Sequence, residues 1–220
     1  MKKSKNKNMK KNKKDISVGL FYPWKIFLIF SIAFLNLLTY FLVLHFKIPL
    51  FLDTWATALG TLLGGLPVGI IGGVLYNVVL SSVTGGPVSI IWALSSILIA
   101  IMTWVFWERG WMDIKKPKMV LVSGLITGFF NGMLTLLISF AFFDGLPTFE
   151  PTAVIWEKCY NLFGGNIVAA GLFEHMGVEI VDKTLVFFIA AFLLDLLTRN
   201  RKKRKNKKPA LIKKKALRKK

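Results

Sequence analysis

The residues of this chain that could carry chemistry are polar side chains placed inside long apolar runs. Asn36, Asn77 and Asn131 each lie ~15–18 Å along a separate run, if each residue adds ~1.5 Å of helix. A polar side chain without a partner is costly in lipid, so these asparagines indicate either a hydrogen-bond network between helices or a polar pocket. Because no acid–base or nucleophile pair lies at matched depth, the pattern favours binding over catalysis, and we expect no enzyme.

Two further groups of residues could contact a small ligand. In the run 119–142, Thr127, Asn131 and Thr135 form a polar stripe at helical spacing beside a stripe of glycines. Ligand sites use few polar groups on rigid elements, which such a stripe would provide. Earlier in the chain, Asp53 opens an apolar run, and the ring of Trp92 could stack on an aromatic ligand. The candidate ligand contacts are therefore Asn36, Asp53, Thr57, Asn77, Trp92, Thr127, Asn131 and Thr135.

The composition indicates which elements must position these residues. The chain has 220 residues, of which 54% are hydrophobic, and its mean hydropathy is +0.56. A soluble domain of this length would not normally contain so many long apolar runs. We therefore expect an all-α integral membrane protein with six transmembrane helices and a wetter, amphipathic stretch at 143–179. The expected spans are 24–44, 53–64, 67–83, 88–106, 119–142 and 181–197.

The second and third spans are expected to form a short glycine-rich hairpin within Phe51–Pro87. A hydrocarbon core of ~30 Å needs ~20 helical residues, and each half of this stretch is shorter than that. As one helix the stretch would carry Pro67 in its middle, so we expect a break at 64–67. Glycines at every fourth residue let helices approach closely in lipid. The expected packing glycines are Gly60, Gly64, Gly69, Gly73, Gly124, Gly128 and Gly132.

The formal charge of +19 lies mostly at the two ends of the chain. Basic segments beside transmembrane helices stay in the cytoplasm and attract anionic lipid, which we prefer to nucleic-acid binding here. With both ends inside, the loop 107–118 is also inside, and the outside segments carry seven acids against three lysines. We expect a multi-pass protein of the cytoplasmic membrane: a disordered basic tail at 1–20, a membrane domain at 21–198 and a second basic tail at 199–220.

The motifs of common catalytic and cofactor sites are absent from the sequence. There is no P-loop, no HExxH and no GxSxG, and the single cysteine, Cys159, excludes an internal disulfide. The neighbours Glu174 and His175 are weak evidence for a metal pair. Glu179 and Lys183 have the favourable i,i+4 spacing of a helical ion pair, which needs no function. We expect neither a cofactor nor a metal.

Two stretches resemble a family of transport proteins. The run LDTWATALGTLLGGLPVGIIGGVLYNVV, residues 52–79, resembles the second and third helices of the substrate-binding S components of energy-coupling-factor (ECF) vitamin transporters. The run 179–184, EIVDKT, is similar to the acid-then-Asp-Lys pattern that opens the last helix in many S components. Many of them carry an Ala-xxx-Ala pattern in the first helix, whereas here Ala33 is followed four residues later by Leu37.

The resemblance implies a small-molecule pocket that faces outside, is capped by loops, and includes Lys183. It also implies partners, namely a transmembrane coupling protein and two ATPase subunits that power uptake. The alternative is a non-transporting membrane sensor or structural protein of similar fold. Because acids outnumber lysines in the outside segments, a neutral or cationic ligand is favoured, such as a thiamine-like or other heterocyclic vitamin or precursor.

Overall fold

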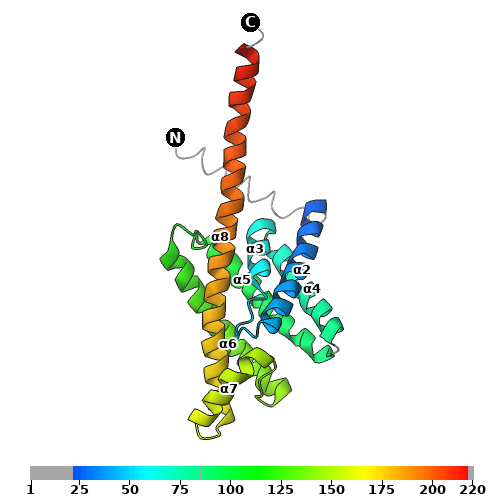
Figure 1. Ribbon diagram of the computed structural model, residues 1–220, viewed down its shortest axis with the longest axis vertical. Coiled ribbons are helices and arrows are strands. Elements are labelled where there is room, and N and C mark those ends of the chain that lie inside the picture. Colours follow the sequence, from blue (N-terminus) through cyan, green and yellow to red (C-terminus); the bar gives the residue numbers. More distant parts are fainter. Residues whose placement is uncertain (1–21, 85, 218–220) are drawn as a thin grey trace, which may run out of the picture.

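The computed structural model describes residues 22–84 and 86–217, and within these ranges it is helical without strands (Figure 1). The tail expected at 1–20 lies outside the described residues. The helix α2 begins at the same end of the bundle from which α8 extends, and α7 lies at the opposite end. The elements are α2 (Pro23–His45), α3 (Trp55–Gly64), α4 (Leu66–Thr84), the 3₁₀ helix η1 (Pro87–Trp92), α5 (Ala93–Glu108), α6 (Pro117–Phe143), α7 (Glu150–Leu162) and α8 (Ile167–Leu217).

Four of these helical segments are long and apolar enough to cross a membrane: Pro23–His45, Leu66–Thr84, Ile90–Glu108 and Pro117–Phe143. They correspond to the first, third, fourth and fifth expected spans, and they indicate a membrane protein. The other two expected spans differ in character. The helix α3 has only 10 residues, and α8 carries charged residues inside its packed part.

The hairpin of α3 and α4 turns where the glycines and the proline of the sequence predicted. The helix α3 ends at Gly64, and Gly65 has φ +91°, a conformation that side chains with a Cβ rarely adopt. Pro67 lies in the first turn of α4, where its missing N–H breaks no helical hydrogen bond. A Cβ on Gly69 would collide with the side chain of Thr61 across the hairpin, so the two helices are in close contact.

The shortness of α3 has a structural cause, because segment 46–54 runs back into the bundle before α3 begins. The indole N–H of Trp55 donates to Thr39 on α2, and the backbone N–H of Ala56 donates to Asn36. Asn36 is nine residues before the end of α2, so α3 begins ~13 Å inside that end. Irregular backbone at such a depth is tolerated where it is surrounded by protein. This segment takes Asp53 into the interior.

The helices α6 and α8 form the tightest pair, and they run antiparallel. A Cβ on Gly124 would lie 2.6 Å from the Cα of Thr184, and one on Gly128 would lie 2.5 Å from the Cα of Ile180. A Cβ on Gly132 would lie 2.9 Å from the sulfur of Met176. The remaining expected packing glycines also face neighbouring side chains: Gly60 faces Ile32, Gly64 faces Val68 and Leu28, and Gly73 faces Ser96 and Thr57.

The start of α8 differs from the expected last span. We expected a wet stretch to continue to residue 179 and a helix to begin near Val181, whereas α8 already begins at Ile167. Charged residues before Val181 made this stretch look like a loop, but Glu174 and Glu179 are buried by the surrounding helices. Burial inside the bundle therefore replaced the apolar composition that the prediction required. The helix also continues to Leu217, through most of the basic segment expected at 199–220.

Candidate functional site

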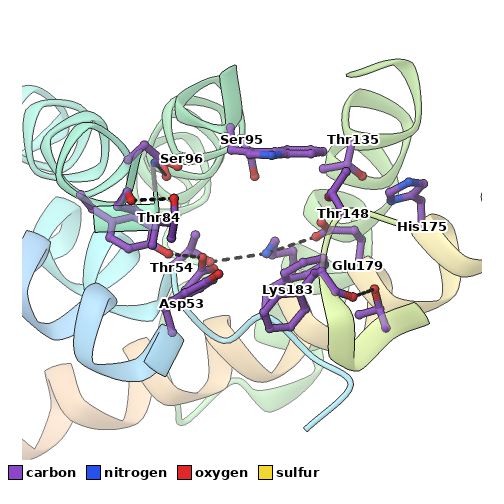
Figure 2. Close-up of a pocket in the computed structure, with 18 of the residues that line it drawn as sticks. Asp53, Thr54, Thr84, Ser95, Ser96, Thr135, Thr148, His175, Glu179 and Lys183 are labelled. Atoms are coloured by element: carbon purple, nitrogen blue, oxygen red, sulfur yellow. Dashed lines mark hydrogen bonds and ion pairs between the residues drawn. The ribbon is translucent and has the colours of Figure 1, made fainter. Parts of the chain in front are cut away.

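A cavity of about 240 Å³ lies inside the bundle, near the end where α7 and segment 46–54 meet. Every α-helix except α3 contributes residues to its wall, and so do η1 and the connection between α6 and α7 (Figure 2). Ligand sites commonly measure ~300–1,000 Å³, so this cavity is suited to a molecule of one or two rings. Its wall combines charged, hydroxyl and aromatic side chains, which we describe in turn.

Lys183, the one lysine among the described residues of the wall, lies between two carboxylates of its own helix. Its Nζ is 3.1 Å from Oε2 of Glu179 and 2.5 Å from Oδ2 of Asp182, and all three side chains are at most 2% exposed. A buried cation is tolerated only with such partners, since an unpaired one would cost several kcal/mol. Two carboxylates against one lysine leave this group with a surplus of negative charge.

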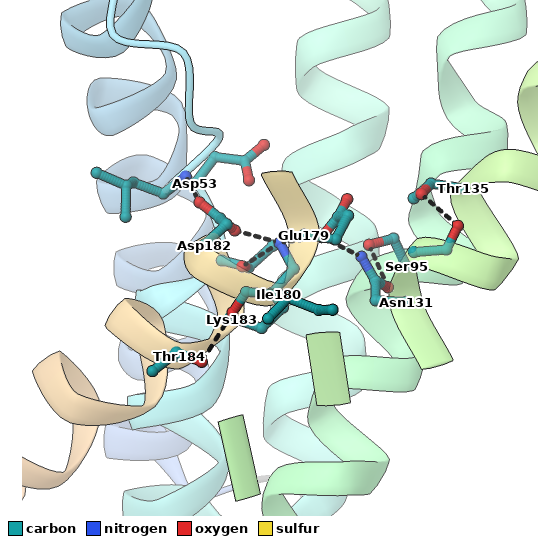
Figure 3. A network of polar contacts seen from close by, with 12 residues as sticks. Asp53, Ser95, Asn131, Thr135, Glu179, Ile180, Asp182, Lys183 and Thr184 are labelled. Carbon is teal, nitrogen blue, oxygen red and sulfur yellow. Dashed lines mark hydrogen bonds and ion pairs between the residues drawn. The ribbon is translucent and has the colours of Figure 1, made fainter. Parts of the chain in front are cut away.

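The charged group is joined to three neighbouring elements by hydrogen bonds (Figure 3). The amide of Asn131 on α6 donates to Glu179 over 2.8 Å, and its oxygen accepts from Ser95 on α5 at 2.9 Å. The backbone N–H of Leu52 donates to Asp182 over 2.7 Å, which ties segment 46–54 to α8. The direction of each acid is therefore fixed before any ligand arrives.

A further acid, Asp53, faces the cavity from segment 46–54. It accepts a hydrogen bond of 2.6 Å from the hydroxyl of Tyr76 on α4. The hydroxyl of its neighbour Thr54 lies 3.5 Å from the Nζ of Lys183, so segment 46–54 and α8 meet at this point. The amide of Asn77, one residue further along α4, donates to Ser96 and to the backbone oxygen of Gly73.

Aromatic rings supply the apolar part of the wall. Trp92 is stacked on Phe143, with ring centroids 5.7 Å apart and an angle of 11° between the rings. Phe51 and Tyr40 both contact Phe149, at centroid distances of 5.1 and 5.7 Å. The Nζ of Lys183 lies 5.8 Å from the ring of Phe51. A flat ligand would therefore find aromatic faces on more than one side.

Glu174 and His175 form a third polar group in the wall, and Figure 2 shows His175 across the cavity from Asp53. They are 1% and 4% exposed, and Nδ1 of His175 lies 3.3 Å from Oε2 of Glu174 without hydrogen-bond geometry. No set of three His, Cys, Asp or Glu side chains in the described ranges is placed to hold a metal ion.

Five of the residues expected to contact ligand line the cavity, namely Asp53, Asn77, Trp92, Thr135 and Lys183. The other four lie outside its lining. Asn36 donates to the hydroxyl of Thr57 over 2.8 Å, Thr127 donates to the backbone oxygen of Ser123, and Asn131 supports Glu179. The three asparagines were expected to form either a hydrogen-bond network between helices or a polar pocket. All three make hydrogen bonds between helices, and Asn77 also lines the cavity.

Several residues of the wall were not predicted from the sequence. Glu179 was taken as half of a helical ion pair without function, and Glu174 and His175 only as a weak metal pair. A signal existed for part of this set, because His175, Glu179 and Lys183 recur every four residues and so lie on one face of a helix. The hydroxyl-bearing wall residues Thr54, Tyr76, Ser95, Ser96, Thr148 and Thr152 had no distinguishing pattern.

Comparisons of the chain with protein-family models, with curated proteins and with solved structures give no match.

Proposed function

We propose that this chain is the membrane-embedded substrate-binding subunit of an ECF-type importer. It captures a small vitamin-like molecule from outside the cell, and partner subunits drive uptake with ATP. The observation that carries the proposal is the cavity itself: a space of about 240 Å³ inside a helical bundle, lined by paired charges and aromatic rings. A bundle that only needed to be stable would fill this space with side chains, because interiors are close-packed.

The proposed topology has six spans with both termini in the cytoplasm. It is supported by the common end at which α2 begins and the basic part of α8 extends. Basic residues gather on the cytoplasmic side of membrane proteins, so this end is inside. The cavity, which lies towards α7 at the other end, then opens outward and is covered by segment 46–54 and by α7.

The proposed substrate is a neutral or cationic heterocycle. Asp53, Glu174 and Glu179 line the cavity together with a single lysine, which already contacts two carboxylates. An anionic ligand would meet this surplus of negative charge in a region of low dielectric, which is strongly unfavourable. The stacked ring of Trp92 supports a planar ligand, and a thiamine-like compound satisfies both requirements.

The proposed partners are a transmembrane coupling protein and two ATPase subunits, because the sequence lacks a P-loop of its own. The non-transporting sensor or structural protein remains the second candidate, favoured by the absence of an Ala-xxx-Ala pattern around Ala33.

Purification from native membranes tests the proposal. The tagged full chain is isolated in mild detergent, and mass spectrometry identifies both retained small molecules and co-purified proteins. We expect a bound heterocycle and two ATPases of the ABC type. A bound ligand without ATPases, in repeated preparations that retain lipid, would favour the sensor, and the absence of any ligand would contradict a binding subunit. A parallel preparation of an unrelated multi-pass protein controls for non-specific carry-over.

A further inference from the structure

The polar groups of the cavity wall differ in whether the protein itself supplies their partners. Lys183 contacts two carboxylates, Asp53 accepts from Tyr76, and Asn77 donates to Ser96. These groups need nothing from a ligand to be satisfied. A ligand that bound them would first have to break contacts with the protein, and that would cancel much of the gain.

Glu174 and His175 are the exceptions among the groups of this wall. The Oε2 atom of Glu174 and both ring nitrogens of His175 are buried without a hydrogen-bond partner. Leaving such an atom unsatisfied costs its full desolvation penalty, and this penalty is larger when the group is charged. Both side chains belong to the cavity lining, so the missing partner can come from a molecule inside the cavity.

The surroundings of Glu174 define the chemistry of that partner. In the described part of the chain no lysine or arginine forms an ion pair with Glu174, and its nearest basic group is His175. Its neighbours in the wall on α6 and α7, Thr135 and Thr152, are hydroxyl residues, and their hydroxyls already donate to backbone oxygens. The site therefore offers the carboxylate oxygens of Glu174 and one acceptor nitrogen and one N–H donor of His175, and no described lysine or arginine pairs with its carboxylate.

We propose that Glu174 and His175 form the subsite for a flat organic cation with two parallel N–H donors, of the amidinium or 2-aminopyridinium type. This inference rests on the proposed function and adds the ligand class and the position of its polar end. A carboxylate accepts two parallel N–H bonds from such a group, as it does from arginine. The attached ring extends into the cavity, where Trp92 provides a flat face. Lys183 and its carboxylates serve as fixed wall and do not hold the cation.

Two probes of the same shape test the subsite. Benzamidinium carries the amidinium group, and benzamide is its neutral counterpart with one N–H₂ and one carbonyl. Binding of each probe to the purified full chain in lipid nanodiscs is measured by calorimetric titration. We expect benzamidinium to bind at least about tenfold more tightly than benzamide, since hydrogen bonds between charged groups are roughly twice as strong as neutral ones.

Substitutions then locate the cation. We expect Glu174→Gln to abolish the preference, because the glutamine keeps the shape and removes the charge. The matched control is Glu157→Gln on the exposed face of α7, which should keep it. The melting temperature of each ligand-free variant reports whether it is folded. If Glu174→Gln does not fold, His175→Leu replaces it and should weaken benzamidinium binding by about fivefold, because leucine can neither donate nor accept a hydrogen bond.

Three outcomes would overturn the subsite. Equal affinity for the two probes would exclude a cation site while leaving the cavity as a binding site. A preference removed by Asp53→Asn and kept by Glu174→Gln would move the cation to the other side of the cavity. Failure of both probes to bind at millimolar concentration would exclude a one-ring cation. None of these results decides the proposed function, which depends on the retained native ligand and the co-purified ATPases.

Discussion

The close contact of α6 with α8 predicts an unusually large effect from a single methyl group. In Gly128→Ala the new Cβ would lie 2.5 Å from the Cα of Ile180 and 2.7 Å from the backbone oxygen of Glu179. Both are backbone atoms, so no side chain can rotate out of the way. To restore an ordinary contact of 3.4 Å or more, the helices must separate by about 1 Å, and packing contacts along the pair would lose a quarter to a half of their energy.

The magnitude follows from two opposing effects. Overpacking of this kind costs ~1–3 kcal/mol, and contact with backbone places this site at the upper limit. Replacement of glycine by alanine in a helix contributes ~1 kcal/mol in the other direction. We therefore expect a net loss of ~2 kcal/mol in the free energy of unfolding. The matched control is Gly177→Ala on α8, where an added Cβ meets nothing within 4 Å and stability should stay equal or rise.

Unfolding by sodium dodecyl sulfate in mixed micelles, followed by circular dichroism, measures both variants against the wild-type chain. The free energies of unfolding of Gly128→Ala and Gly177→Ala should differ by ~3 kcal/mol. Both variants gain the same helix propensity from alanine, so this difference is the overpacking cost at Gly128. A separation below ~1 kcal/mol would show that α6 and α8 are not packed backbone to backbone, and would refute the reasoning.

Three further expectations follow from contacts described above. Lys183→Met leaves Glu179 and Asp182 without their cation and should cost ~3–5 kcal/mol in the same unfolding assay; a loss below ~1 kcal/mol would mean that water reaches the group. Asn131→Leu removes the donor to Glu179 and should lower stability by ~1–3 kcal/mol; titration of the folded fraction with the native ligand should show retained binding, and lost affinity at unchanged stability would instead place Asn131 in contact with ligand. Cys159 on α7 should react with an impermeant maleimide added to intact cells from which any outer membrane has been removed, and labelling only after lysis would speak against an outward-facing α7.

The extent to which the sequence predicts this fold depends on the kind of signal. Apolar runs predicted α2, α4, α5 and α6 to within a few residues, because burial in lipid and in protein requires the same composition. The turn before Pro67 was equally readable, since glycine and proline restrict the backbone locally. The start of α8 was not readable, because the burial of Glu174 depends on α6 and α7, which are distant in the sequence.

The candidate site was predictable to a similar degree. Residues such as Trp92 and Thr135 could be placed at a depth in the membrane by counting along a helix. Depth does not say which side of a helix faces a cavity, and Asn131 illustrates this, because it points to Glu179 behind the wall. Which polar atoms lack partners is a property of the assembled bundle, so the orphaned nitrogens of His175 could be recognised only in three dimensions.

The charged group on α8 also has a consequence for biosynthesis. On insertion scales an acid or a lysine at the centre of a span opposes entry into the bilayer by ~2.5–3.5 kcal/mol, and α8 carries Glu179, Asp182 and Lys183 beside the middle of α6. In the proposed topology α8 is also the last span to leave the ribosome, when α6 with its glycine face is already in place. We therefore expect α8 to insert in contact with α6, without first being surrounded by lipid. Insertion and packing are then one step for this helix.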